Sequence, residues 1–137
     1  MPVAKASAGV PLFIPSDTVI AANDTEHTET TAGLHKVKEM QLISRINGSS
    51  KFRFAFDGLG NAINTYGQVF RNGSIMGSQW TFPADGSYHT YSEDINASNF
   101  QVGEFIQLYV YIPSLSTTKV KNFRFEGTES LWMNTAV

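Results

Sequence analysis

Histidine and carboxylate residues are the first candidates for chemistry in this sequence, and their spacing argues against catalysis. His27, His35 and His89 lie on three separate stretches, and none belongs to an H-E-x-x-H motif or a similar metal-binding spacing. Glu93 and Asp94 are adjacent in a segment of strand-like composition, so their side chains should point to opposite faces of a sheet. They could not then act together as a catalytic carboxylate pair. We therefore expect surface or hydrogen-bonded structural histidines.

Other catalytic and metal-binding signatures are missing. The sequence contains no G-x-S-x-G motif, P-loop or dinucleotide-binding fingerprint. Four acidic residues lie near predicted loops, where a hard cation such as Ca²⁺ could bind: Asp17, Asp24, Glu26 and Asp57. They do not form an ordered Asp-x-Asp-x-Asp-Gly loop. We predict that the protein is not an enzyme and has no catalytic residue, cofactor or metal site.

Aromatic residues are a stronger candidate, because rings on the face of a β-sheet can form a platform for carbohydrate. The rings that could contribute lie in several predicted strands: Tyr66, Trp80, Tyr88, Tyr91, Tyr109 and Tyr111. Under the alternative function given below, the candidate glycan platform consists of Tyr66, Trp80, Tyr88 and Tyr91. The sequence leaves a second interpretation open, in which Trp80 belongs to the core and the tyrosines line the edges of the sheets with their hydroxyls in water.

The elements that must position these rings are β-strands, and the clearest of them form a hairpin over residues 66–75. A strand-like run leads into Asn72-Gly73, the dipeptide that most readily takes positive φ at both central positions of a type I′ turn. An isolated hairpin is only marginally stable in water, so further strands must cover its apolar face.

Alternation of apolar and polar residues predicts those further strands. Phe52, Phe54 and Phe56 leave one face of a strand, and the same period of two recurs downstream. We expect a turn at residues 47–50, a flexible loop at 57–61, a connection at 96–103, and a bulge where the phase changes across Lys38-Glu39. Helical periodicity is missing, so the pattern predicts an antiparallel sandwich or barrel. The other predicted strands are residues 17–22, 26–31, 34–43, 78–82, 88–95, 105–112 and 120–126.

Composition narrows the possible partners. The chain has 137 residues, no cysteine and a formal net charge of -2. This length suits one domain with its own core, and the lack of cysteine excludes disulfides. A nucleic-acid partner is not expected, because the basic residues are few and scattered. No membrane partner is expected either, since no apolar run approaches the ~18 residues that span a bilayer.

Two terminal segments lie outside the strand pattern. We predict an extended N-terminal arm over residues 1–16, where three prolines oppose both helix and central strand. A β-sandwich domain follows over residues 17–126, and a C-terminal arm over 127–137. The arms either fold back on their own domain or lie on a neighbouring subunit. Their apolar residues are the candidate contacts with a capsid or a neighbouring subunit: Val10, Leu12, Phe13, Ile14, Leu131, Trp132 and Met133.

Six segments occur in an order that resembles a β-sandwich domain of tailed-bacteriophage structural proteins. They are HKVKEMQL (35–42), KFRFAFD (51–57), TYGQVFRNGSIMG (65–77), YHTYSEDI (88–95), VGEFIQLYV (102–110) and VKNFRF (120–125). The resemblance covers roughly residues 17–125 and leaves out both arms. It implies an all-β, jelly-roll-like antiparallel β-sandwich with extended N- and C-terminal arms.

The resemblance also implies a place on a virion. Small size and terminal arms lead us to expect a capsid decoration protein, which stabilises the head by binding the major capsid protein on the outer capsid surface. Arms exchanged around a symmetry axis would suit a homotrimer. The alternative is a tail-fibre or baseplate module that binds host-surface carbohydrate.

Overall fold

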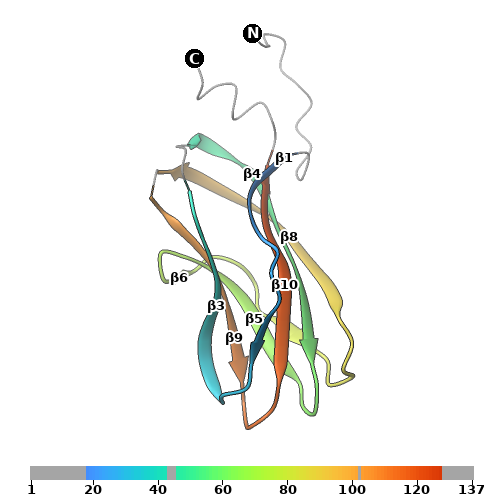
Figure 1. Ribbon diagram of the computed structural model, residues 1–137. Coiled ribbons are helices and arrows are strands. Elements are labelled where there is room, and N and C mark those ends of the chain that lie inside the picture. The colour runs from blue at the N-terminus through green and yellow to red at the C-terminus, as the bar shows by residue number, and fades with distance from the viewer. Residues whose placement is uncertain (1–17, 43–45, 102, 128–137) are drawn as a thin grey trace.

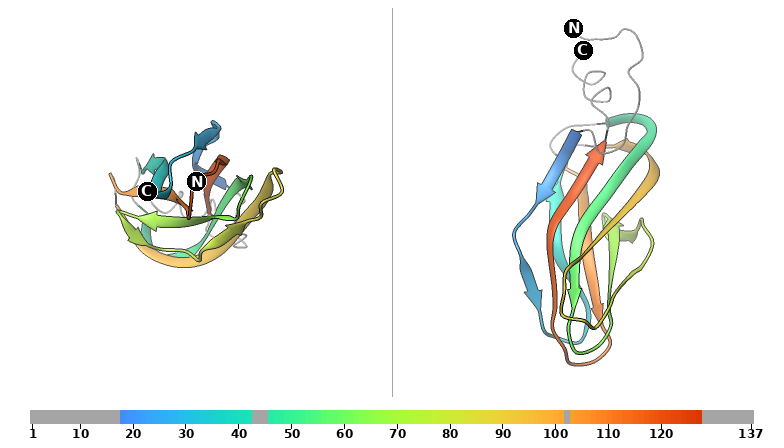
Figure 2. Two further views of the ribbon diagram at one scale, coloured as in Figure 1. Left: turned by 90° about the horizontal axis from the view of Figure 1, so that it is seen from below. Right: turned by 90° about the vertical axis from the view of Figure 1, so that its right-hand side faces the viewer.

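Ten β-strands form two antiparallel sheets in the computed structural model, which describes residues 18–42, 46–101 and 103–127 (Figure 1). We call the first the β10 sheet. Its order is β1 (Thr18–Asn23), β10 (Thr118–Gly127), β4 (Ile46–Gly60) and β8 (His89–Phe100), and β2 (His27–Glu29) also pairs with β10. The right-hand view of Figure 2 shows β1, β10, β4 and β8 side by side.

The second sheet, which we call the β9 sheet, has the order β3-β9-β5-β6. It consists of β3 (Gly33–Gln41), β9 (Phe105–Ile112), β5 (Thr65–Arg71) and β6 (Ser74–Ile75), and β7 (Trp80–Phe82) also pairs with β5. The predicted all-β antiparallel sandwich is therefore confirmed.

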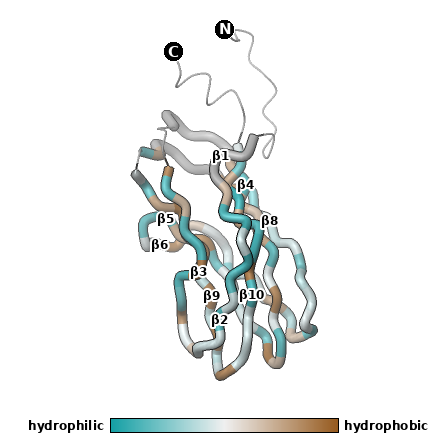
Figure 3. The backbone as a smooth tube through the Cα atoms, viewed as in Figure 1, coloured by the Kyte–Doolittle hydropathy of each residue, from teal (hydrophilic) through white to brown (hydrophobic). Residues whose placement is uncertain are grey.

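Phenylalanine fills the space between the two sheets. Hydrophobic and hydrophilic residues lie beside one another along the same strands (Figure 3), and the inward positions carry the apolar residues. Phe54 stacks on Phe125 with ring centroids 5.0 Å apart, and Phe52 meets Phe100 edge-on at 5.1 Å. Seven phenylalanines are at most 1% exposed: Phe52, Phe54, Phe56, Phe82, Phe100, Phe123 and Phe125.

Phe82 holds the short strand β7 in this core by packing on glycine backbone. A Cβ atom added at Gly58 or Gly67 would lie 2.5 Å from the Phe82 ring. A Cβ at Gly60 would lie 2.6 Å from the Phe82 carbonyl oxygen. Glycine at these three positions therefore leaves the room that β7 needs to pack against the backbone. The predicted loop at residues 57–61 is wrong for this reason, because Gly58 and Gly60 are strand residues of β4 whose lack of a side chain makes room for Phe82.

The central hairpin is confirmed in detail. Asn72 and Gly73 have φ values of 49° and 81°, as a type I′ turn requires. Strand β5 ends before this dipeptide at Arg71, and β6 begins after it at Ser74.

Two other predicted connections are strands. Residues 47–50, expected as a turn, belong to β4, and residues 96–100, expected as a connection, belong to β8. These two strands pair from Gly58↔His89 to Ile46↔Phe100, with a register shift between Ile46 and Ser49. The long pairing overrides the turn-like composition of Asn47 to Ser50.

A lysine of β3 links two edge strands, β3 of the β9 sheet and β1 of the β10 sheet. The register of β3 against β9 shifts between Lys36 and Lys38, close to the predicted bulge. Lys38 points inward and is only 5% exposed. Its ammonium group donates hydrogen bonds to Asn23 Oδ1 at 2.9 Å and to the Thr25 carbonyl oxygen. Burial lowers the pKa of Lys38, although the nearby Asp24 opposes this shift.

Candidate functional site

The outer faces of the two sheets differ in chemistry. The outer face of the β10 sheet carries charged side chains that are paired with one another. Arg53 Nε donates to Asp94 Oδ1 at 2.6 Å, and Arg124 Nε donates to Asp24 Oδ1 at 3.0 Å. Exposed pairs of this kind contribute little stability and are typical of a solvated face.

The outer face of the β9 sheet is aromatic instead. On β5 and β9, the residues that alternate with the buried ones point away from the core. Tyr111 is 41% exposed, and Leu34 beside it on β3 is 57% exposed. The outward residues of the two central strands are Tyr66, Gln68 and Phe70 on β5 and Phe105, Gln107, Tyr109 and Tyr111 on β9.

Four of these rings lie in two pairs across the β5–β9 ladder. Tyr66 and Tyr111 are directly opposite in register, with ring centroids 6.2 Å apart and an interplanar angle of 31°. Phe70 and Tyr109 are closer, with centroids 4.3 Å apart. We call these four residues the aromatic face. Within the described part of the chain, the hydroxyl groups of its three tyrosines have no hydrogen-bond partner.

Amide and charged side chains border the aromatic face and hold one another in place. Gln107 Nε2 donates to Glu39 Oε2 at 2.8 Å, and Gln107 Oε1 accepts from the Gly73 backbone N–H at 2.8 Å. Lys36 Nζ donates to the same carboxylate at 2.9 Å. The hydrogen bond from Gln107, with further help from Lys36, lowers the pKa of Glu39. The charges beside the rings therefore cancel.

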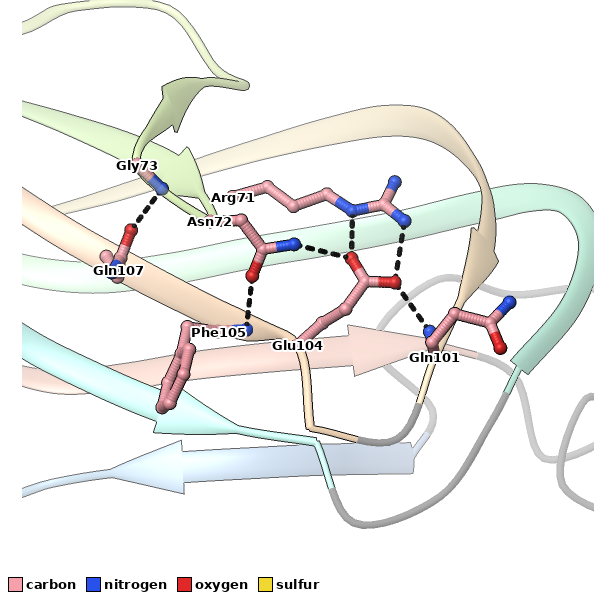
Figure 4. Close-up of polar contacts among 7 residues, drawn as sticks. All are labelled: Arg71, Asn72, Gly73, Gln101, Glu104, Phe105 and Gln107. Atoms are coloured by element: carbon pink, nitrogen blue, oxygen red, sulfur yellow. Dashed lines mark hydrogen bonds and ion pairs between the residues drawn. The ribbon is translucent and has the colours of Figure 1, made fainter.

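A network of hydrogen bonds around the Glu104 carboxylate fixes the hairpin that carries Phe70 (Figure 4). Glu104 accepts from Arg71 Nε at 2.6 Å, from Arg71 Nη2 at 3.0 Å and from Asn72 Nδ2 at 3.1 Å. The Gln101 backbone N–H donates to it at 2.6 Å, and Asn72 Oδ1 accepts from the Phe105 N–H at 2.8 Å. The hydrogen bonds from Arg71 hold the pKa of Glu104 below its ordinary value. The turn is thereby tied to the start of β9.

Trp80 and Tyr91 of the predicted platform lie elsewhere, where β7 and β8 meet at the edge of the sandwich. Both are half-buried and pack against the core, with ring centroids 5.7 Å apart. The Tyr91 ring stacks on Phe56 at 5.6 Å, and its hydroxyl donates to the Thr81 carbonyl oxygen at 2.9 Å. Burial raises the pKa of Tyr91. These contacts make Trp80 and Tyr91 part of the packing.

Tyr88 has its own surroundings beside the β10 sheet. Lys121 Nζ lies 4.2 Å from the centroid of the Tyr88 ring, and the Tyr88 hydroxyl donates to Glu26. Burial, reinforced by that hydrogen bond, raises the pKa of Tyr88. One face of this ring is thus covered by a cation. Of the four residues predicted as a platform, only Tyr66 belongs to the aromatic face.

The sequence reasoning considered Tyr109 and Tyr111 but missed the apolar residues around them. Phe70, Leu34 and Ile75 also lie on the outer side of the β9 sheet. A signal was available, because Phe70 alternates with the buried Val69 and so occupies a position where a polar residue is usual. The arm residues, Val10 to Ile14 and Leu131 to Met133, lie outside the described residues.

The polar candidates are used in local contacts. Glu93 accepts from Ser78, whereas Asp94 pairs with Arg53 on the opposite side, so the prediction of opposite faces is confirmed. His89 contacts Asp85 at 2.7 Å. Among residues 18–42, 46–101 and 103–127, no three histidine or acidic side chains gather as metal ligands would. None of these residues forms a helix that is long and apolar enough to cross a bilayer.

Two solved structures with a similar architecture are described as carbohydrate-binding modules. The sequence matches no protein-family model and no curated protein. The module CBM6cm-2 from Cellvibrio mixtus lichenase 5A, solved with cellotriose, superposes with a TM-score of 0.50 at 15% identity, over 82% of this chain and 100% of that one. The C-terminal CBM6 of LamC from Zobellia galactanivorans gives a TM-score of 0.49 at 14% identity, over 84% and 98% of the chains. This chain shares the β-sandwich fold of the Cellvibrio module.

Proposed function

We propose that the protein is a non-catalytic binding module that takes up carbohydrate on the aromatic face. The observation that carries this proposal is the Tyr66–Tyr111 pair, whose two rings lie side by side on an outward-facing sheet surface. Aromatic rings offer apolar area to the C–H faces of a sugar, and phenol hydroxyls can bond to its hydroxyl groups. An exposed aromatic cluster rimmed by polar groups is typical of a binding surface.

The shared fold supports the choice of carbohydrate. The Cellvibrio mixtus module is described in a complex with cellotriose, so a sandwich of this architecture can present a surface that binds a sugar chain. The contrast between the two outer faces supports it further, because Arg–Asp ion pairs lie on one sheet, while four rings lie on the other, three with hydroxyls that bond to no described residue. On a phage particle, such a module would belong to a tail fibre or baseplate and would bind host-surface carbohydrate.

A glycan array tests this function. Wild-type protein should bind a subset of the glycans, and Tyr111→Ala and Tyr66→Ala should each weaken binding at least about tenfold, or 1.4 kcal/mol. Tyr88→Ala is the matched control, because it removes the same side chain from a ring that Lys121 already covers. The proposal is wrong if no glycan binds, or if binding survives both Tyr66→Ala and Tyr111→Ala.

Capsid decoration is the second candidate, and one observation favours it. Thr18 pairs with Gly127, so the segments 1–17 and 128–137 join the sandwich at neighbouring positions. If these segments are the predicted arms, they would begin at one end of the sandwich and could engage the same neighbour in a capsid lattice, where a homotrimer would bind the major capsid protein. Quantitative mass spectrometry of purified virions distinguishes the candidates. A copy number comparable with that of the capsid protein supports decoration, whereas a few copies per particle support a tail module.

A further inference from the structure

The aromatic face continues into exposed aliphatic residues at two opposite corners. Leu34 on β3 is paired with Tyr111, and Ile75 on β6 is paired with Phe70. Their side chains are 57% and 66% exposed. The apolar surface therefore runs diagonally across four strands, from Leu34 over the four rings to Ile75. We call this surface the diagonal band.

The diagonal band is too long for a single sugar ring. The step from β3 across β9 and β5 to β6 covers three strand spacings, or ~14 Å. Tyr66 and Phe70 are four residues apart on β5, which adds ~13 Å along the strands. The diagonal is thus about 19 Å from end to end by these spacings. Because the residues at both ends are more than half exposed, no side chain of residues 18–42, 46–101 and 103–127 closes the band as a pocket for a chain terminus would require.

Charge narrows the class of ligand. The cation that borders the band in the described strands of this face is Lys36, and its ammonium group is bonded to Glu39 at 2.9 Å. Glu39 is held in turn by Gln107, so the pair is fixed and neutral overall. A ligand rich in carboxylate or sulfate groups would meet no available positive charge on these strands. The free energy that its charged groups need to shed water would therefore not be offset by ion pairs.

We propose that the diagonal band binds the interior of a linear, uncharged oligosaccharide, laid across the strands from Leu34 to Ile75. This proposal rests on the carbohydrate-binding function above and adds the class of sugar and the mode of binding. The four rings in the middle of the band can contact an oligosaccharide of any length. Leu34 and Ile75 are reached only by an oligosaccharide that spans several sugar units.

Isothermal titration with ligands of graded length tests the proposal. The probes are neutral cello-, laminari- and xylo-oligosaccharides of two to six units, and an acidic hexamer of galacturonic acid. For a neutral series that binds, affinity should rise at least about tenfold, or 1.4 kcal/mol, from dimer to hexamer and should be insensitive to salt. The acidic hexamer should not bind measurably.

Substitutions at the two ends of the band distinguish the contribution of its ends to affinity from that of its central rings. Leu34→Ser and Ile75→Ser should each weaken the hexamer several-fold and leave the dimer unchanged, whereas Tyr111→Ala should weaken both. Leu115→Ser is the control, because Leu115 is 84% exposed in the β9–β10 loop and is not one of the residues of the band. All three serine changes are at exposed positions, and thermal unfolding checks that the variants remain folded.

The outcomes are distinguishable from a failure of the function itself. Affinity that does not change with chain length, or equal binding of the acidic hexamer, overturns the proposed mode while carbohydrate binding stands. Hexamer binding that survives both Leu34→Ser and Ile75→Ser overturns the diagonal placement. Failure of every neutral oligosaccharide to bind, when the glycan array does show a ligand, overturns this inference alone, whereas failure in both experiments overturns the function as well.

Discussion

The close packing of Phe82 on glycine allows a sharp test of the packing beneath the aromatic face. A Cβ atom at Gly67 would lie 2.5 Å from Cζ of the Phe82 ring, closer than real Cβ atoms approach other atoms, and 3.0 Å from Cε1 of the same ring. That ring is 0% exposed and lies 6.0 Å from Phe56 and 5.2 Å from Tyr91, centroid to centroid. Gly67→Ala must therefore displace a ring that has no free space beside it.

The expected magnitude follows from two opposing terms. Overpacking a well-packed core costs about 1–3 kcal/mol, and a clash of this depth against a rigid ring belongs at the upper end. Alanine recovers about 0.5–1 kcal/mol over glycine inside a strand. Gly67→Ala should therefore lower the free energy of unfolding by about 2 kcal/mol, a large fraction of the 5–15 kcal/mol typical of a domain. Urea unfolding followed by circular dichroism measures this change.

A double-mutant cycle identifies the cause. In a Phe82→Leu background the smaller side chain leaves room for the new methyl group, so the cost of Gly67→Ala should fall by about 1–2 kcal/mol. Gly73→Ala serves as the control, because its Cβ would meet nothing within 4 Å and its cost comes only from the positive φ of 81°. That cost should be the same in both backgrounds. Additive effects of Gly67→Ala and Phe82→Leu would refute the steric reasoning.

Two further predictions concern polar groups. Since the folded-state pKa of Glu104 is lowered, its contribution to stability should be complete above about pH 4.5 and lost as pH falls through the lowered value. Glu104→Gln should flatten this acid limb of a stability-against-pH curve, and a limb identical to that of wild type would contradict the role of the Arg71 pair. Thr118→Val should cost about 1–2 kcal/mol in urea unfolding, because the buried Thr118 hydroxyl donates to the Leu59 carbonyl oxygen at 2.8 Å and accepts from Thr65 at 3.0 Å. A valine variant as stable as wild type would show that this buried chain of hydroxyls contributes nothing.

Local patterns predicted the strands best where the two faces of a strand differ. Strand β9 begins and ends at the predicted residues, Phe105 and Ile112, because its inward residues are all aliphatic. The prediction failed within β4, where Asn47 to Ser50 and Gly58 to Gly60 resemble turns in composition. Strands β10 and β8 pair with β4 on its two sides, and the second glycine-rich stretch is required by the bulk of Phe82. Such requirements come from residues distant in the chain and leave no local mark.

The candidate site shows the same division. Alternation along β5 and β9 could place Tyr66 and Tyr111 on outward faces, but their adjacency depends on the sheet order and on a register between residues 45 positions apart. Trp80 and Tyr91 were grouped with Tyr66 because they are aromatic and lie in neighbouring predicted strands, whereas the fold turns them toward the core.

The most informative residues of the diagonal band are those that break the rule of alternation. A sheet with one solvated face normally places polar side chains outward, as the β10 sheet does with its paired arginines and aspartates. Leu34, Phe70 and Ile75 are apolar residues at outward positions of three different strands. The strand pairing places all three beside the tyrosines, in the diagonal band. Apolar area that is left in water adds little to the stability of the monomer, so a set of such residues that converges from separate strands is consistent with the ligand that we propose for this band.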